Sequence, residues 1–179
     1  KAMRIFSLAC LLFASSFSSS QSFTPTNAGS AITFKIKNFG ATIDGSFTGL
    51  KGEIHFDPTQ LNSSRFEITL DANSIDTGID LRNKHLKKED YFNVKTYPEI
   101  KFVSSKIESQ SGNYSVTGKL TIKKTTKEIE FDFTAQKPST GYLFKGEFPL
   151  NRRDYEVGGN SFSMADDVKV FISVSCIEK

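Results

Sequence analysis

The chain has 179 residues, with 23 basic and 20 acidic side chains, so its formal net charge is only +3. This length fits one domain, or one domain preceded by a processing segment. Hydrophobic residues make up 37% of the chain and include 17 Phe, which predicts a packed apolar interior and excludes a disordered chain. The small positive excess is spread thinly, so a nucleic-acid-binding protein is not expected.

Residues 1–22 have the layout of a secretory signal peptide. Lys1 and Arg4 precede an apolar stretch over residues 5–17, and small polar residues follow. A basic segment, a short apolar segment and small residues beyond it are typical of such leaders. The apolar stretch is too short to span a bilayer comfortably, so we expect cleavage and no stable membrane anchor. The remaining domain, residues 23–179, is then periplasmic or secreted.

The two cysteines bear on processing and on stability. Cys10 lies in the apolar part of the leader, but Ser7 stands where a lipobox has an aliphatic residue. Lipoprotein processing at Cys10 therefore stays open as an alternative. After cleavage Cys176 is the only cysteine, so no intramolecular disulfide can form and stability must come from burial.

Beyond Phe23, apolar and polar residues alternate with a period of two, which predicts eight strands. Alternation with one apolar face is typical of an antiparallel sheet whose other face meets water. Eight such strands joined mostly by short turns can close into a barrel, and a two-sheet sandwich is the alternative. The apolar positions fall within residues 32–36, 43–56, 66–70, 100–102, 114–122, 129–133, 142–150 and 168–174.

The second strand changes its apolar parity part-way along. Ile43 and Phe47 fall on odd positions, whereas Leu50 and Ile54 fall on even ones. A slip of one residue beside Gly49 predicts a β-bulge that bends a long strand.

Residues 74–97, here called the lid segment, form a connection too long for a hairpin. A connection longer than about 12–15 residues indicates a functional loop or its own secondary structure. Asp80 is expected to cap a short helix that carries Leu81, His85 and Leu86 on one face.

A further turn is expected over residues 88–93, with Tyr91 and Phe92 facing the barrel. The lid segment is then either a plug that seals one end of the barrel or a lid over a ligand mouth. The residues alone leave both readings open.

The residue types give little indication of catalysis. His55 lies between apolar neighbours on a predicted strand, so it should point to solvent. His85 lies near Arg82 and Asp90, but no nucleophile and no third orienting group accompany it. We expect these three side chains to hold the lid segment by hydrogen bonds. Two distant histidines and one cysteine also lack the spacing of a metal site, so neither catalytic nor metal-binding residues are predicted.

Each of several short motifs is a weak indicator by itself, but their order and spacing together are specific. They are Phe34–Gly40 (FKIKNFG), Gly45–Gly52 (GSFTGLKG), Phe56–Pro58 (FDP), Ser74–Gly78 (SIDTG), Val116–Ile122 (VTGKLTI) and Asn151–Tyr155 (NRRDY), with Arg82, His85, Asp90 and Phe92 in the lid segment. In this order they resemble the YceI-like family of secreted bacterial lipid-binding proteins, and the resemblance covers residues 31–174.

The resemblance implies an all-β protein: an extended, eight-stranded, lipocalin-like antiparallel barrel with a short helical lid between the third and fourth strands. It also implies that the apolar pore holds a long isoprenoid chain, in some members an isoprenoid quinone, with no cofactor besides that lipid. Arg82, His85, Asp90 and Phe92 would then form the lid, with Arg82 and His85 as donors to a headgroup. The residues expected to line the pore are Phe34, Ile36, Phe47, Ile54, Phe66, Ile68, Leu70, Phe102, Leu120, Phe131, Phe133, Phe144, Phe148, Val170 and Ile172.

Two other functions stay open. One is a solid-cored secreted β-domain that binds a protein partner, and the other is an enzyme that acts on an isoprenoid lipid. Gly118 and Gly146 fall on inward positions, where a missing side chain either widens the bore or marks a close approach of the backbone. The sequence does not determine the headgroup of the lipid or the oligomeric state, for which a homodimer is one candidate.

Overall fold

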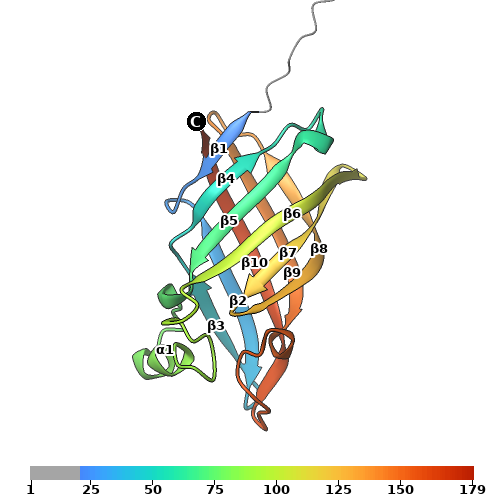
Figure 1. The fold of residues 1–179 in the computed structure, drawn as a ribbon. Coiled ribbons are helices and arrows are strands. Elements are labelled where there is room, and N and C mark those ends of the chain that lie inside the picture. Colours follow the sequence, from blue (N-terminus) through green and yellow to red (C-terminus); the bar gives the residue numbers. More distant parts are fainter. Residues whose placement is uncertain (1–20) are drawn as a thin grey trace, which may run out of the picture.

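The computed structural model describes residues 21–179, so all but the end of the expected signal peptide, including Cys10, lies outside the described residues. Ten antiparallel strands form one sheet that closes on itself (Figure 1). The strands are β1 (Ser22–Pro25), β2 (Ala31–Asn38), β3 (Ala41–Phe47), β4 (Lys51–His55), β5 (Arg65–Asp71), β6 (Glu99–Gln110), β7 (Asn113–Ile122), β8 (Thr125–Gln136), β9 (Tyr142–Asn151) and β10 (Met164–Glu178). The helices are α1 (Asp80–Leu86) and the 3-10 turns η1 (Leu61–Ser63), η2 (Ala72–Ser74) and η3 (Arg152–Tyr155). Within residues 21–179, none of the helices has the length and apolar character that crossing a membrane requires.

The ten strands occupy eight positions around the barrel. β1 and β2 both pair with β10, at Pro25 with Cys176 and at Ala31 with Ser173, so together they act as one interrupted strand. β3 and β4 form one bent strand, which pairs with β2 and with β1 and so closes the circle. The predicted eight-stranded antiparallel barrel is therefore confirmed, and the sandwich is wrong. The sequence pattern missed β1 because four residues that end in a proline show no sustained alternation.

The bend in the second predicted strand is present, as a break of three residues rather than a bulge of one. Residues 48–50 leave the ladder between β3 and β4, and Gly49 takes a left-handed φ of 72°. Two hydrogen bonds tie Thr48 to the end of β5 and to η2, which follows it. The Thr48 N–H donates to Ser74 Oγ (2.8 Å), and its carbonyl accepts from the Asp71 N–H (3.2 Å). The break lets Phe47 and Leu50 both point into the core despite their opposite parity.

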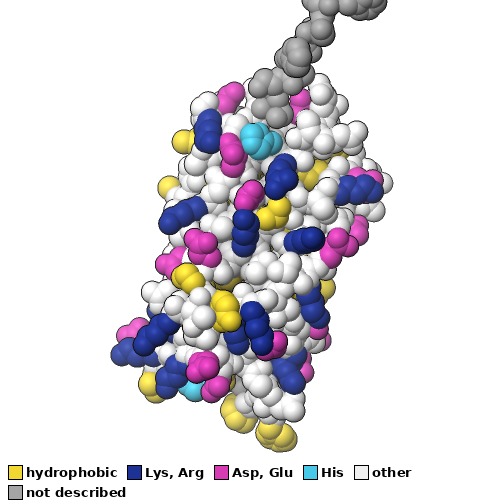
Figure 2. Space-filling model, viewed as in Figure 1, with side chains coloured by type: hydrophobic (Ala, Val, Ile, Leu, Met, Phe, Trp, Pro, Cys, Tyr) yellow, Lys and Arg dark blue, Asp and Glu magenta, His cyan; other side chains and the backbone are white. Residues whose placement is uncertain are grey.

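The outer face of the strands is polar and mixed in charge (Figure 2). Ion pairs join neighbouring strands, as between Lys101 and Glu67 (2.6 Å) and between Lys169 and Glu147 (2.7 Å). His55 lies on this face near Glu53, with its Nε2 3.5 Å from a carboxylate oxygen, which confirms its outward direction. Exposed pairs of this kind contribute little stability, but they show that the polar parity of each strand meets water.

The barrel interior is packed solid at the end that carries β1. Phe56 packs edge-on against Tyr114, Tyr142 and Phe144, each with a centroid distance of 5.2 Å. Such aromatic pairs stabilise a core beyond their burial alone. Cys176 belongs to this cluster, where burial raises the pKa of its thiol.

The lid segment covers the opposite end, here called the lid end (Figure 1). α1 begins at Asp80, but its N-cap is Ile79 without a side-chain hydrogen bond, so the predicted cap by Asp80 is wrong. Asp80 lies in the first turn, where a carboxylate favours the helix dipole. The predicted shared face is also wrong, because Leu81 is 78% exposed. Arg82 and Leu86, four residues apart, form the face that meets the barrel interior.

The expected turn after α1 is confirmed. The N–H groups of Tyr91 and Asn93 donate to the Lys88 carbonyl at 3.0 and 2.9 Å. The Phe92 ring packs edge-on against Phe47, with a centroid distance of 5.4 Å. The lid segment thus contacts the barrel through its aromatic residues.

Candidate functional site

An apolar cavity of about 240 Å³ lies inside the barrel on the lid side of the aromatic cluster. Every strand position that the sequence predicts to face the bore contributes to its lining. These fifteen residues are Phe34, Ile36, Phe47, Ile54, Phe66, Ile68, Leu70, Phe102, Leu120, Phe131, Phe133, Phe144, Phe148, Val170 and Ile172. Their placement around one cavity follows from the strand parity, whereas their contact with a ligand stays a prediction.

The cavity is long and narrow. Its lining includes both Ile32 and Asn38 on β2, and at about 3.3 Å per residue the stretch between them spans about 20 Å. Its volume is below the range of about 300–1,000 Å³ typical of sites for compact drug-sized ligands. A small volume extended over this length fits a linear chain better than a compact ligand.

The inward glycines do not widen the bore. A Cβ atom at Gly118 would lie 2.6 Å from Cζ of Phe102, and one at Gly146 would lie 2.7 Å from the Asp132 carbonyl oxygen. Gly45 on β3 is covered in the same way by the ring of Phe34. Of the two readings of Gly118 and Gly146, the wider bore is therefore wrong and a close approach of a ring or the backbone is confirmed.

Of Arg82, His85 and Asp90, Arg82 has the side-chain hydrogen bonds that were predicted, and it lines the cavity together with Phe92. Its Nε donates to Thr77 Oγ1 (2.7 Å) and its Nη2 donates to the Thr77 carbonyl (2.6 Å). These bonds fix the guanidinium at the polar end of the bore. A charged donor held in this place could meet the headgroup of a chain that fills the bore.

His85 and Asp90 do not line the cavity, so His85 is not placed beside Arg82 as a donor to a headgroup in the bore. Both face a separate outer cleft that also includes Arg153. The His85 ring packs on Tyr91 at 4.8 Å, and its nitrogens have no hydrogen-bond partner in residues 21–179. Asp90 helps to fasten the lid through its backbone, because its carbonyl accepts from the Gly158 N–H (2.8 Å). The cause is helical spacing, since the inward face of α1 belongs to residues 82 and 86.

Two polar atoms at the lid end were not identified from the sequence. Tyr155 in η3 and Asn38 at the end of β2 both line the cavity. The Tyr155 hydroxyl and the Asn38 Oδ1 are buried and have no hydrogen-bond partner among the described residues. Burial, reinforced by the charge of Asp154, raises the pKa of Tyr155 to about 12, so its hydroxyl stays a neutral donor at physiological pH. Buried polar atoms without partners are costly, and they mark a place for a polar group of a ligand.

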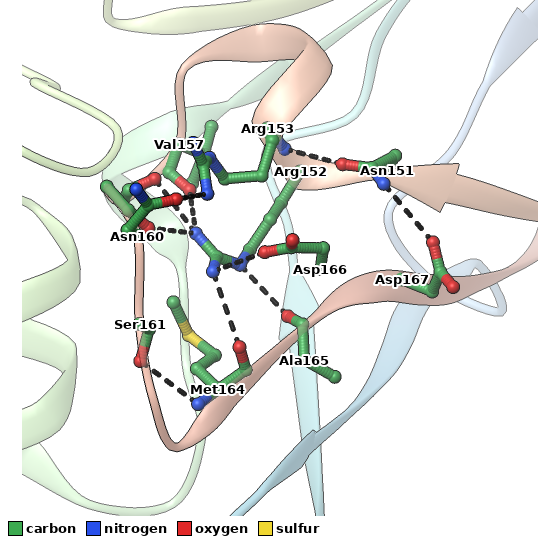
Figure 3. A network of polar contacts seen from close by, with 12 residues as sticks. Asn151, Arg152, Arg153, Val157, Asn160, Ser161, Met164, Ala165, Asp166 and Asp167 are labelled. Atoms are coloured by element: carbon green, nitrogen blue, oxygen red, sulfur yellow. Dashed lines mark hydrogen bonds and ion pairs between the residues drawn. The ribbon is translucent and has the colours of Figure 1, made fainter.

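A buried arginine organises the same end of the barrel (Figure 3). Arg152 is 4% exposed and also lines the cavity. It pairs with Asp166 at 2.6 Å, and its other bonds go to backbone carbonyls. These carbonyls belong to Ala165 (2.9 Å), Val157 (2.9 Å), Gly158 (2.8 Å), Gly159 (3.0 Å) and Met164 (3.4 Å). Arg152 thereby holds the loop between η3 and β10 against the barrel. The NRRDY motif contains this arginine, but the motif alone does not distinguish Arg152 from exposed Arg153.

The side chains around the cavity suit binding rather than acid–base chemistry. Neither histidine lines it. Within residues 21–179, no three His, Cys, Asp or Glu side chains gather as a metal site would require. The arrangement is a channel lined mostly by hydrocarbon, with polar side chains at one end, namely Asn38, Arg82, Arg152 and Tyr155.

Comparison with known proteins places this barrel in a family. The family model described as the YceI-like domain matches residues 23–176. A UPF0312 protein of Pectobacterium atrosepticum is 27% identical over 155 residues, covering 83% of this chain and 81% of that protein.

Two solved structures have the same fold. The crystal structure of Burkholderia cenocepacia BcnA is 28% identical, with a TM-score of 0.80 over 84% of this chain and 98% of that chain. A polyisoprenoid binding domain from Saccharophagus degradans, implicated in plant cell wall breakdown, is 16% identical, with a TM-score of 0.71 over 89% of this chain and 99% of that chain. The barrel, its lid and the family match agree with one another, and this chain belongs to the YceI-like domain family.

Proposed function

We propose that this protein binds the apolar chain of a long isoprenoid lipid inside its barrel, as a periplasmic or secreted carrier or store, and does not alter the lipid chemically. The observation that carries the proposal is a narrow cavity that is lined mostly by hydrocarbon along its length and carries the polar side chains of Arg82, Asn38 and Tyr155 at the lid end. Burial of the chain would supply about 25 cal/mol per Å² of apolar surface.

The isoprenoid class rests on the family resemblance and on the shape of the cavity. The ligand named for the Saccharophagus degradans domain is of the same class, although at 16% identity that domain supports the fold alone. The polar end of the lipid is expected near Arg82 and Tyr155, because the other end of the cavity meets aromatic rings.

The proposal is tested by incubating the purified protein with a long-chain prenyl alcohol, removing free lipid, and extracting the complex for mass spectrometry. We expect unaltered alcohol, saturating at one molecule per barrel. A chemically altered product would favour the enzyme alternative. If the protein retains neither the alcohol nor a straight-chain alkane of equal length, the solid-cored domain that binds a protein partner is favoured.

Substitutions in the lid segment should separate retention from catalysis. Arg82→Ala removes two hydrogen bonds to Thr77, so we expect release of a fluorescent prenyl lipid to become about 5- to 10-fold faster. His85→Ala should change release by less than about twofold, because His85 is exposed and outside the cavity. If His85 were a general base, its loss would instead reduce turnover by about 10²- to 10⁴-fold, and altered lipid would appear with the wild type alone.

Tyr155→Phe should show whether the Tyr155 hydroxyl contacts the polar end of the ligand. In the ligand-free protein the hydroxyl has no partner to lose, so the free energy of unfolding should stay equal or rise by up to about 1 kcal/mol. Affinity for the prenyl alcohol should fall about 5- to 10-fold, while affinity for the alkane of equal length should not change. Titrations with both lipids check this, and an equal loss for both would contradict a contact between Tyr155 and the polar end.

A further inference from the structure

Exposed apolar side chains gather at the lid end. Five large apolar side chains are exposed in residues 21–179, and four belong to this end: Phe39 (79%), Ile79 (52%), Leu81 (78%) and Phe162 (104%). We call these four residues the apolar rim. In Figure 2 hydrophobic side chains protrude at the lower end, below the polar wall of the barrel. The fifth residue, Ile177, is 52% exposed near the C-terminus, at the opposite end.

The rim comes from three segments that meet around the cavity. Phe39 lies in the turn between β2 and β3, and its N–H donates to the Ser163 carbonyl (2.8 Å), which places this turn beside the loop of Phe162. Ile79 is the N-cap of α1 and Leu81 lies in its first turn. Arg82 on the same helix lines the cavity together with Asn38 and Met164 from the other two segments. The rim therefore surrounds the polar end of the bore.

Phe39 occupies a turn position that disfavours a bulky side chain. Phe39 and Gly40 have φ values of 49° and 77°, the pair of positive angles that a type I′ turn requires. Asn-Gly is the favoured pair there, and a bulky side chain in the left-handed region is strained. A residue that is unfavourable for the turn and also exposed indicates a contact outside the molecule.

Lysines accompany the rim. Lys37 lies on β2, two residues before Phe39. Lys84 lies on α1, and Lys88 lies just after it. None of the three has an ion-pair partner among the described residues. Asp80 and other nearby acidic side chains offset part of this charge. Apolar contact should therefore supply most of the binding free energy, and the lysines should make binding depend on the salt concentration.

We propose that the lid end docks on the surface of an anionic phospholipid bilayer, with the apolar rim among the acyl chains and the lysines at the headgroup level. Separate tips on three segments suit a fluid surface that adapts to them, whereas a protein partner would need a matching solid surface. Docking in this orientation turns the polar end of the bore toward the membrane. The proposal goes beyond lipid binding in the cavity, because its test requires no bound lipid.

The test is flotation of the purified protein with vesicles of equal parts phosphatidylglycerol and phosphatidylethanolamine, compared with phosphatidylcholine vesicles. We expect the wild type to float with the anionic vesicles and to bind less tightly at high salt. Phe39→Asn combined with Phe162→Ser should weaken binding at least about tenfold. Asparagine suits the left-handed turn, so the fold should persist, and melting temperatures check this.

A matched control separates the rim from general surface hydrophobicity. Ile79→Ser should weaken vesicle binding, whereas Ile177→Ser, at a residue of equal exposure, should behave as the wild type. Absence of wild-type flotation, or equal flotation of both variants, would overturn the proposal. Self-association in solution that the double variant abolishes would assign the rim to a second copy and would overturn it too. Neither Phe39 nor Phe162 lines the cavity, so prenyl alcohol binding without vesicles should be unchanged and tests the proposed function separately.

Discussion

Arg152→Ala is expected to lower the free energy of unfolding by about 3 kcal/mol, because it breaks a buried hydrogen-bond network. The guanidinium is 4% exposed and donates six hydrogen bonds, five of them to backbone carbonyls in the loop before β10 and at its start. Alanine leaves those carbonyls without a donor and opens a space beside the cavity. Asp166 is half exposed, so water can solvate its carboxylate, and most of the loss should come from the carbonyls.

Arg153→Ala is the matched control for this prediction. Arg153 is the next residue in η3, but it is exposed and its guanidinium bonds to the side chain of Asn160. Its loss should change the free energy of unfolding by no more than about 0.5 kcal/mol. Urea denaturation followed by circular dichroism measures both variants. Equal midpoints for the two would show that the carbonyl network contributes nothing to stability.

The sequence was most informative about the barrel wall. A strand exposes alternate residues on alternate faces, so the parity of Phe34, Phe66 or Phe131 determines whether the side chain points inward once one face is known to be buried. The pore-lining prediction depends only on this parity, and the structure places those residues around one cavity. Even the parity change near Gly49 was visible, although its three-residue length was not.

The lid end was much less predictable. α1 has seven residues, too few for its apolar spacing to determine an inward face, so the pattern groups Leu81 and His85 with Leu86, although of these three only Leu86 lines the cavity. Arg152 is buried by residues 157–166, which form the loop before β10 and the start of that strand, and Tyr155 packs against residues from distant strands. No local pattern reports such burial. The membrane-docking proposal likewise depends on turns that lie far apart in sequence and meet only in the fold.

Ile68→Trp is expected to reduce affinity for a long prenyl alcohol by at least about 100-fold while the barrel stays folded. Ile68 lies on β5 and lines the cavity midway between Phe66 and Leu70. Its cross-strand neighbours are Gly52 on β4 and Phe102 on β6. An indole at this position would project across the bore. Overpacking should therefore cost about 1–3 kcal/mol, less than the stability of an ordinary domain.

Thr69→Trp provides the matched control, because Thr69 is the next residue on β5 and lies on the outer face between Lys51 and Lys101. It adds the same indole outside the barrel, so lipid affinity should stay within about twofold of the wild type. Titration with the prenyl alcohol measures affinity, and urea denaturation measures stability. If the lipid threads through the bore, the Ile68→Trp protein should lose binding of the long alcohol and keep its fold. A short prenyl alcohol that fills only the lid end should then bind to the Ile68→Trp protein better than a long one. An Ile68→Trp protein that is destabilised yet binds the long chain normally would show that the lipid does not occupy the bore.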